Sequence, residues 1–172
     1  MKSKILLTVL LLAVSAASFA RRAAPGIVAV VRNDFAVTMP GRVTEMKSSR
    51  DLTGVKIPGK LITRTYMCNA GRLGNFMVVV QEYPKGTYTG MDTKEILAPM
   101  ESSSKKSGME TRFIRHRGMV GLEMIMQNPG NPMGSHSRMF VKGDRTYTLT
   151  ANTNLKNNPY LKRFFSSFKL MK

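Results

Sequence analysis

Phe76-Met77-Val78-Val79-Val80 is the stretch of sequence that decides the fold. Every side chain in it is apolar. Because successive side chains of an extended strand point to opposite faces, both faces of this strand are apolar. Such a strand must be covered on both faces, which is typical of the interior of a sheet. We therefore expect a sheet with other elements, most naturally helices, packed on each side of it.

Sequence patterns before and after this stretch predict further strands of the same sheet. Residues 61–67 alternate β-branched and basic side chains, and Gly71 and Gly74 separate them from the central strand, which predicts a hairpin. Clear turn chemistry separates further strands downstream. These are expected at residues 110–116, 119–127, 135–141 and 145–153. The pattern predicts the α+β class, with a central antiparallel sheet of six to eight strands and helices packed on its faces.

Another hairpin is predicted in the amino-terminal part of the domain. Residues 27–31 and 35–39 flank the turn Arg32-Asn33-Asp34, and the second run alternates in a way that gives it one buried face. A third strand is expected to begin at residues 43–46 and to end before the polar stretch 47–53.

A first helix is predicted after residue 91. Asp92 and Glu95 have the spacing of a capping box at a helix start. Pro99 follows, and a proline inside a helix costs about 3 kcal/mol unless the helix kinks or restarts there. The helix is therefore expected to be weakened at Pro99, and residues 102–108 are expected to close the segment.

The last helix is better determined. Asn158 can cap it and Pro159 suits its first helical position. Its apolar face consists of Leu161, Phe164, Phe165 and Phe168, and its outer face of Lys162, Arg163, Ser166, Ser167 and Lys169. We expect this helix to dock on the sheet through its phenylalanines.

The amino terminus has the features of a secretory signal peptide. Lys2 and Lys4 precede an apolar run at residues 5–14, and Ser18-Phe19-Ala20 offers small side chains at a cleavage site. The run is shorter than the roughly 20 residues of a membrane span. We expect the mature chain to be exported to the periplasm or the exterior. The predicted organisation is a signal peptide at 1–20, a flexible lead-in at 21–26 and a single α+β domain at 27–172.

The charge of the chain is strongly basic. Its 172 residues include 27 Lys and Arg against 10 Asp and Glu, a net charge of +17. Removal of Lys2 and Lys4 leaves 25 basic residues against the same 10 acidic ones, or about +15. A domain of this charge is attracted to anionic lipid headgroups, acidic wall polymers or acidic proteins. No longer basic run that would indicate specific nucleic-acid recognition is present.

Cys68 is the single cysteine of the chain, so no internal disulfide can form. We expect it to be a buried small apolar side chain. An intermolecular disulfide or a reactive thiol is the alternative, although no feature that would lower its pKa is evident near it in the sequence.

One local concentration of basic residues is a candidate anion-binding site. It consists of Lys105, Lys106, Arg112, Arg115 and Arg117. If Arg115 and Arg117 share an exposed strand face, they form a two-point clamp for an anion. The alternative is an ordinary solvated sheet face.

Two further constellations involve histidine. Met133, His136 and Met139 are spaced three apart, and thioether and imidazole ligands suit copper(I), although methionines that pack a β core are the alternative. His136 could also be drawn into a hydrolytic triad with Asp144, but no serine has a nucleophile-elbow pattern, and a surface histidine at a strand start is the default. No catalytic residues and no cofactor are predicted.

Several short motifs resemble those of a known family. They are Phe35-Ala36-Val37-Thr38-Met39-Pro40-Gly41, Gly118-Met119-Val120-Gly121-Leu122-Glu123, Arg138-Met139-Phe140, Asp144-Arg145-Thr146-Tyr147 and Phe164-Phe165-Ser166-Ser167-Phe168. They resemble small exported bacterial proteins that are distantly similar to the PsbP-type fold of photosystem II extrinsic subunits. The resemblance implies an α/β/α sandwich. It also implies a non-enzymatic role, because the photosynthetic members bind a membrane complex and help retain inorganic ions.

Together these observations favour a non-enzymatic exported envelope protein that associates with an anionic partner through its basic surface. Peripheral contact with a membrane fits this expectation, since no transmembrane segment is predicted. A soft-metal binding protein that uses Met133, His136 and Met139 is the alternative function.

Overall fold

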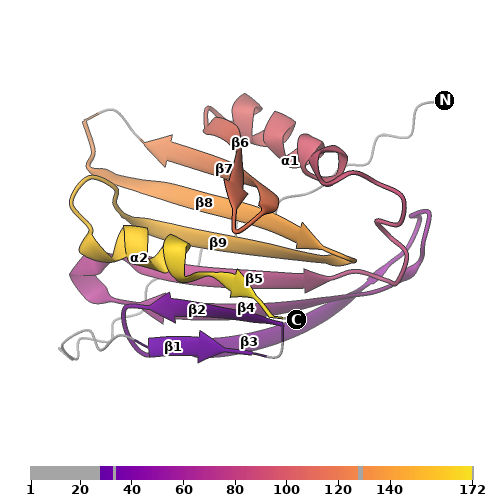
Figure 1. Ribbon diagram of the computed structural model, residues 1–172, viewed down its shortest axis with the longest axis horizontal. Helices are drawn as coiled ribbons and strands as arrows, with labels where there is room; N and C mark the ends of the chain where they lie inside the picture. Colours follow the sequence, from indigo (N-terminus) through magenta and orange to yellow (C-terminus); the bar gives the residue numbers. More distant parts are fainter. Residues whose placement is uncertain (1–27, 33, 128–129, 172) are drawn as a thin grey trace.

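A long antiparallel sheet forms the centre of the computed structural model (Figure 1), which describes residues 28–171 apart from residues 33, 128 and 129. The predicted signal peptide, the lead-in and the start of the domain at Ile27 lie outside the described residues. The seven strands of this sheet follow the order β3-β4-β5-β9-β8-β7-β6. They are β3 (Thr44–Leu52), β4 (Gly59–Asn69), β5 (Asn75–Glu82), β6 (Glu110–His116), β7 (Met119–Gln127), β8 (Met133–Lys142) and β9 (Arg145–Asn154). The predicted α+β class and antiparallel sheet are confirmed.

The amino-terminal hairpin belongs to a second sheet. β1 (Val28–Val31) pairs with β2 (Phe35–Met39), as predicted, and β2 pairs on its other side with β10 (Lys169–Leu170). The order of this small sheet is β1-β2-β10. Sequence reasoning did not predict β10 or the second sheet, because a two-residue strand has no periodicity of its own.

Helix α2 (Pro159–Ser167) and the small sheet cover one face of the long sheet, here called the inner face. Asn158 caps the helix by accepting a hydrogen bond from the Tyr160 backbone at 2.8 Å, as its place in the sequence predicts. The phenylalanines of this segment are buried with residues of β2 and of the inner face, and the Phe164 ring lies 5.3 Å from that of Phe76. Figure 1 shows α2, β10 and β2 together in front of the long strands.

Helix α1 (Thr93–Lys106) packs on the opposite, outer face. Its Leu97 is buried with Leu122 and Met139. Met139 is adjacent in β8 to Phe140, which belongs to the inner core, and neighbouring residues of a strand point to opposite faces. The capping box at Asp92 is confirmed. The helix includes Pro99 and continues to Lys106, so most of the closing segment expected at residues 102–108 is helical.

Coverage of the outer face is partial. The main contacts of α1 are with β6, β7 and β8. The outer-face side chains of β5, Met77 and Val79, are only half-buried, whereas its inner-face residues are buried. The central stretch of the sequence is therefore covered fully on one side, by a mixture of strand and helix. One helix lies on each face, but α1 lies over β6, β7 and β8, so the expected full cover on both sides of the central stretch is found on one side alone.

β3 is longer than expected. The strand was expected to end before the polar stretch 47–53, but it continues to Leu52. Every residue of β3 has a partner in β4, from Thr44 opposite Met67 to Leu52 opposite Gly59. Backbone pairing with a long neighbour outweighs the weak strand propensity of Lys, Ser and Asp.

Candidate functional site

A fully buried carboxylate lies on the inner face. Glu123 is in the middle of β7, and the register places Arg112 of β6 and Arg138 of β8 directly opposite it. Its Oε2 accepts a hydrogen bond from Arg112 Nε at 2.5 Å, and its Oε1 accepts one from Arg138 Nε at 2.8 Å. His136 Nε2 lies 2.8 Å from the same Oε1. The buried carboxylate is therefore held by side chains from both neighbouring strands.

The protonation states in this cluster follow from its geometry. Burial alone would raise the pKa of Glu123, but hydrogen bonds from His136 and Arg112 and the charge of Arg138 outweigh it and lower the pKa. Burial lowers the pKa of His136, and its contact with Glu123 offsets this only in part. At neutral pH the cluster thus holds one carboxylate, a neutral imidazole and two guanidinium groups, an excess of one positive charge.

The cluster supports helix α2. The Phe165 ring of α2 lies 4.3 Å from the His136 ring, and the Arg138 guanidinium carbon lies 4.8 Å from the Phe165 ring centre. One buried carboxylate therefore orients both side chains on which Phe165 rests. The sequence-based expectation of a surface histidine at position 136 is wrong, since only 13 % of its side chain is exposed.

A group of exposed basic residues surrounds α2, and we call it the α2 basic surface. Its members are Arg117, Lys162, Arg163 and Lys169. Arg117 lies in the turn between β6 and β7 and donates a hydrogen bond to the Ser166 carbonyl at 3.3 Å, which brings it to the end of the helix. The neighbouring His116 contacts the Phe168 carbonyl at 2.7 Å and strengthens this connection.

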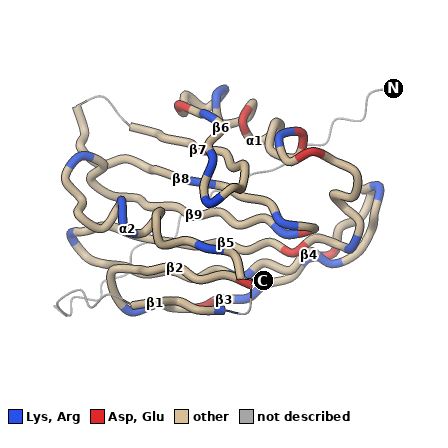
Figure 2. Tube along the Cα trace, viewed as in Figure 1, with Lys and Arg blue, Asp and Glu red and all other residues tan. Residues whose placement is uncertain are grey.

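The α2 basic surface has no acidic residue within its own segment. The sequence contains no Asp or Glu after Asp144. In the described part of the chain, none of the four residues forms an ion pair. Figure 2 shows α2 and the β6–β7 turn on the viewed side, with blue segments and no red segment in either of them.

The structure separates the residues predicted to bind anions. Lys105 and Lys106 lie in the last turn of α1, where Lys105 pairs with Glu101 at 2.7 Å. Arg112 faces the inner side and binds Glu123. Arg115 is directly opposite Val120 in the outer-facing register, and Arg117 lies in the turn beyond the strand. The expected clamp on one strand face is therefore not formed.

Sequence reasoning placed Lys162, Arg163 and Lys169 on the solvent side of the last helix but did not connect them with Arg117. The absence of acidic residues after Asp144 is a signal that could have drawn attention to this end of the chain. No comparable signal marks Glu123, because its partners lie 11 to 15 residues away in the sequence and are brought to it by strand register.

The three residues predicted to bind copper lie on two faces of β8. His136 contacts Phe165 and Glu123 on the inner side, whereas Met139 is buried under α1 on the outer side. Met133 has the same strand parity as Met139, and the three side chains therefore do not converge. Among residues 28–171 as described, no three His, Cys, Asp or Glu side chains are grouped so that they could hold a metal ion.

The histidine is also not paired with Asp144. The Asp144 carboxylate accepts hydrogen bonds from the backbones of Gly86 at 2.7 Å and Tyr88 at 2.9 Å, which lower its pKa. It fixes the loop that follows β5. Cys68 is buried, as predicted, and burial raises the pKa of its thiol.

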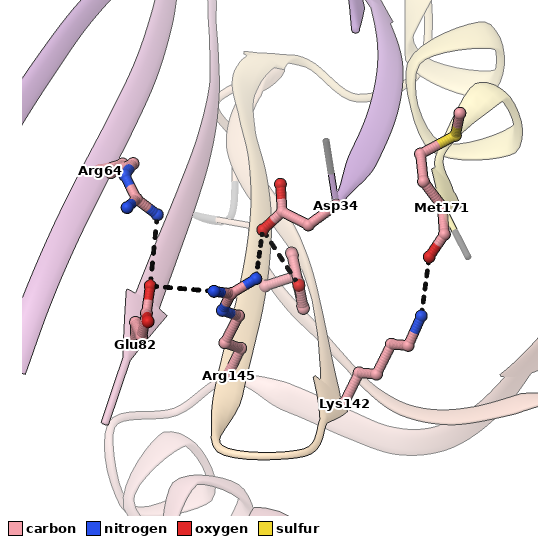
Figure 3. Close-up of polar contacts among 7 residues, drawn as sticks. Asp34, Arg64, Glu82, Lys142, Arg145 and Met171 are labelled. Carbon is pink, nitrogen blue, oxygen red and sulfur yellow. Dashed lines mark hydrogen bonds and ion pairs between the residues drawn. The ribbon is translucent and has the colours of Figure 1, made fainter. Parts of the chain in front are cut away.

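A charged cleft of about 700 Å³ lies where the two sheets meet. Arg145 bridges Glu82 at 3.2 Å and Asp34 at 3.4 Å, and Arg64 contacts the same Glu82 oxygen, Oε2, at 3.4 Å (Figure 3). Tyr147 donates a hydrogen bond to Asp34, and burial, followed by the charge of Asp34, raises the pKa of Tyr147 to about 12.

The lining of this cleft is balanced in charge. Its ionisable carboxylates are Asp34, Glu82 and Asp144, and its cations are Lys85, Lys142 and Arg145. Lys142 donates a hydrogen bond to the Met171 carbonyl at 2.7 Å, as Figure 3 also shows. The polar groups of the cleft therefore join the small sheet and the end of the chain to the long sheet, and they offer no excess of either charge to a ligand.

The architecture defines an α+β protein with a long antiparallel sheet, a small second sheet and two helices. No protein-family model and no curated protein matches the sequence. Among solved structures, the chain is similar to a protein of Bacteroides thetaiotaomicron VPI-5482, with 13 % identity and a TM-score of 0.46. The match covers 80 % of this chain and 45 % of that protein, so this chain spans less than half of its length.

The chain is also similar to cyanobacterial PsbP (CyanoP) from Synechocystis sp. PCC 6803. The identity is 11 %, the TM-score is 0.48, and the match covers 91 % of this chain and 99 % of that one. A structure of the PsbP type, which the short motifs resemble, is thus among the solved structures to which this chain is similar. Within the described residues, no helix is both long and apolar enough to cross a membrane.

Proposed function

We propose that the protein is an exported, non-enzymatic protein that binds an anionic envelope surface through the α2 basic surface. The observation that carries the proposal is the set of cations around α2, which no carboxylate of the described chain neutralises. Unpaired cations on a protein of this net charge create a positive potential that attracts anionic partners.

The position of these cations favours an extended anionic surface as the partner rather than a small ligand. None of Arg117, Lys162, Arg163 and Lys169 lines the charged cleft or the smaller cavity beside α1. All four are exposed, and they lie on or beside a segment that three buried phenylalanines hold in place. A basic surface outside these two cavities suits a sheet of anionic headgroups, which needs charge but no shaped cavity.

Vesicle sedimentation tests the proposal. The protein should sediment with phosphatidylglycerol vesicles but not with phosphatidylcholine vesicles, and about 0.5 M salt should release it, because screening then acts within a few ångströms. Failure to bind anionic vesicles at low salt would contradict the proposal. Binding to polyglutamate in the absence of vesicle binding would identify an acidic protein as the partner instead.

A charge-matched pair of variants locates the surface. Lys162→Glu with Arg163→Glu should weaken vesicle binding about tenfold or more, because each basic residue near an anionic membrane contributes about 1 kcal/mol. Lys56→Glu with Lys60→Glu changes the net charge equally on the β3–β4 hairpin and should have a much smaller effect. Equal losses for the two variants would show that net charge alone, and not the α2 basic surface, governs binding.

A further inference from the structure

Among the described residues, no strand pairs with the outer edge of β3, at one end of the long sheet. β3 is an end strand, and eight of its nine residues are exposed. An edge strand presents unpaired backbone N–H and C=O groups that can pair with another strand. Natural edges are usually shortened, bulged or interrupted by proline, but β3 is long and is paired without a break to β4, and it contains no proline.

The charges on β3 are arranged in a pattern. Lys47 and Asp51 are four residues apart, so both side chains lie on the same face of the strand. Neither forms an ion pair within the described part of the chain. Lys47 is directly opposite Arg64 of β4, an unfavourable like-charge neighbour, so a carboxylate on its free side would be favourable.

A second copy of β3 supplies that carboxylate. When two copies run antiparallel about a two-fold axis at Ser49, Lys47 of each copy is opposite Asp51 of the other. The same register places Met46 of each copy opposite Leu52 of the other, on the other face of the ribbon. The pairing then contains two ion pairs and two apolar pairs, and no like charges meet.

The neighbouring registers lack this complementarity. An axis at Ser48 would place Glu45 opposite Asp51 of the second copy. An axis at Lys47 or at Arg50 would place that residue opposite its own counterpart. Like charges directly opposite each other are destabilising in a sheet, so the sequence of β3 selects the axis at Ser49.

We propose that the protein self-associates through β3, with two copies antiparallel about Ser49, which joins the two long sheets into one. This inference does not depend on the proposed function, since it involves a different edge of the molecule. A ribbon of seven residue pairs is smaller than the roughly 800 Å² per partner of a typical stable interface. The association is therefore a reversible equilibrium between monomer and dimer.

Cysteine cross-linking tests the register. Ser49→Cys should give a disulfide-linked dimer under mild oxidation, because residues directly opposite in an antiparallel pair have Cβ atoms about 4.5–5.5 Å apart. Ser48→Cys is the matched control, since its counterpart would lie two positions away on the ribbon, and it should cross-link at least tenfold more slowly. Equal rates for the two variants would overturn the proposal, and the native Cys68 is buried and does not compete.

A charge exchange tests the ion pairs by sedimentation velocity. Lys47→Asp and Asp51→Lys each create two like-charge pairs in the dimer and should weaken association about tenfold or more, if each pair changes by about 0.7 kcal/mol or more. The double variant restores opposite charges and should return association to near the original value. A monomer at every accessible concentration, or a double variant no better than the single ones, would overturn the proposal.

Discussion

His136 Nε2 lies 2.8 Å from Glu123 Oε1, on the inner face of the long sheet and beneath helix α2. The contact joins a carboxylate that is fully buried to an imidazole whose ring lies against Phe165. Because Arg138 binds the same oxygen and the same ring, the position of α2 depends on one buried charge.

Replacement of Glu123 should destabilise the fold. Glu123→Ala leaves the partly buried Arg138 and His136 without their acceptor, whereas the largely exposed Arg112 can be hydrated. We expect a loss of about 2–3 kcal/mol in the free energy of unfolding, measured by urea denaturation. Glu110→Ala, at an exposed position of β6, is the control and should change stability by less than about 0.5 kcal/mol. A similar loss for both variants would show that Glu123 has no special structural role.

Acidification should reduce stability, and His136 should account for part of the reduction. The pKa of His136 is lower in the folded state than its ordinary value of 6.5, so the unfolded chain binds more protons between the two values. Stability should therefore be constant above pH 6.5 and fall as the pH decreases through that window. Glu123, whose pKa is also lowered, should add a further loss below pH 4.5.

The variant His136→Gln isolates the histidine contribution. Above pH 7 the urea midpoints of the two proteins should depend on pH in the same way. Between pH 6.5 and 5 the variant should lose less stability than the original protein. A midpoint that rises on acidification, or an identical slope in both proteins, would contradict the assigned protonation state.

Truncation of Phe168 should loosen the inner core. Its ring is completely buried and lies 5.4 Å from that of Phe140 and 6.3 Å from that of Phe35, so it contacts both sheets. Phe168→Ala should cost about 3–5 kcal/mol. Ser166→Ala, two positions earlier and exposed, should be nearly neutral. Thermal melts of the two variants distinguish this expectation from a general sensitivity of the carboxyl-terminal segment.

Asp144→Ala should release the loop after β5. The loss of its carboxylate removes the acceptor of the Gly86 and Tyr88 backbone N–H groups. Hydrogen exchange followed by mass spectrometry should show faster exchange in residues 84–91 and unchanged exchange in β9. Unchanged protection of that loop would mean that its conformation does not depend on Asp144.

Local rules predicted most of the elements. β6 and β7 have the predicted bounds, because Arg117-Gly118 and the turns around them determine where these strands end. The caps at Asp92 and Asn158 are formed as their spacing indicates. Each of these features depends on residues that are close together in the sequence.

Features that depend on distant contacts were not predicted. β10 forms only because β2 offers it a partner, and β3 continues past Met46 only because β4 does. The Glu123 cluster and the α2 basic surface each require a register or a helix position that no single segment encodes. The expected clamp needed Arg115 and Arg117 on one strand face, whereas the predicted strand bounds, which the structure confirms, already place Arg117 in the turn after His116.

The small sheet has a consequence for how the chain folds. β2 lies near the beginning of the described chain, yet its second neighbour is the pair Lys169 and Leu170, and the Asp34 carbonyl accepts a hydrogen bond from Met171. The small sheet therefore stays incomplete until β10 is available to it. Contacts between segments so far apart in sequence carry a large loop-closure cost, so we expect this closure to be a late step of folding.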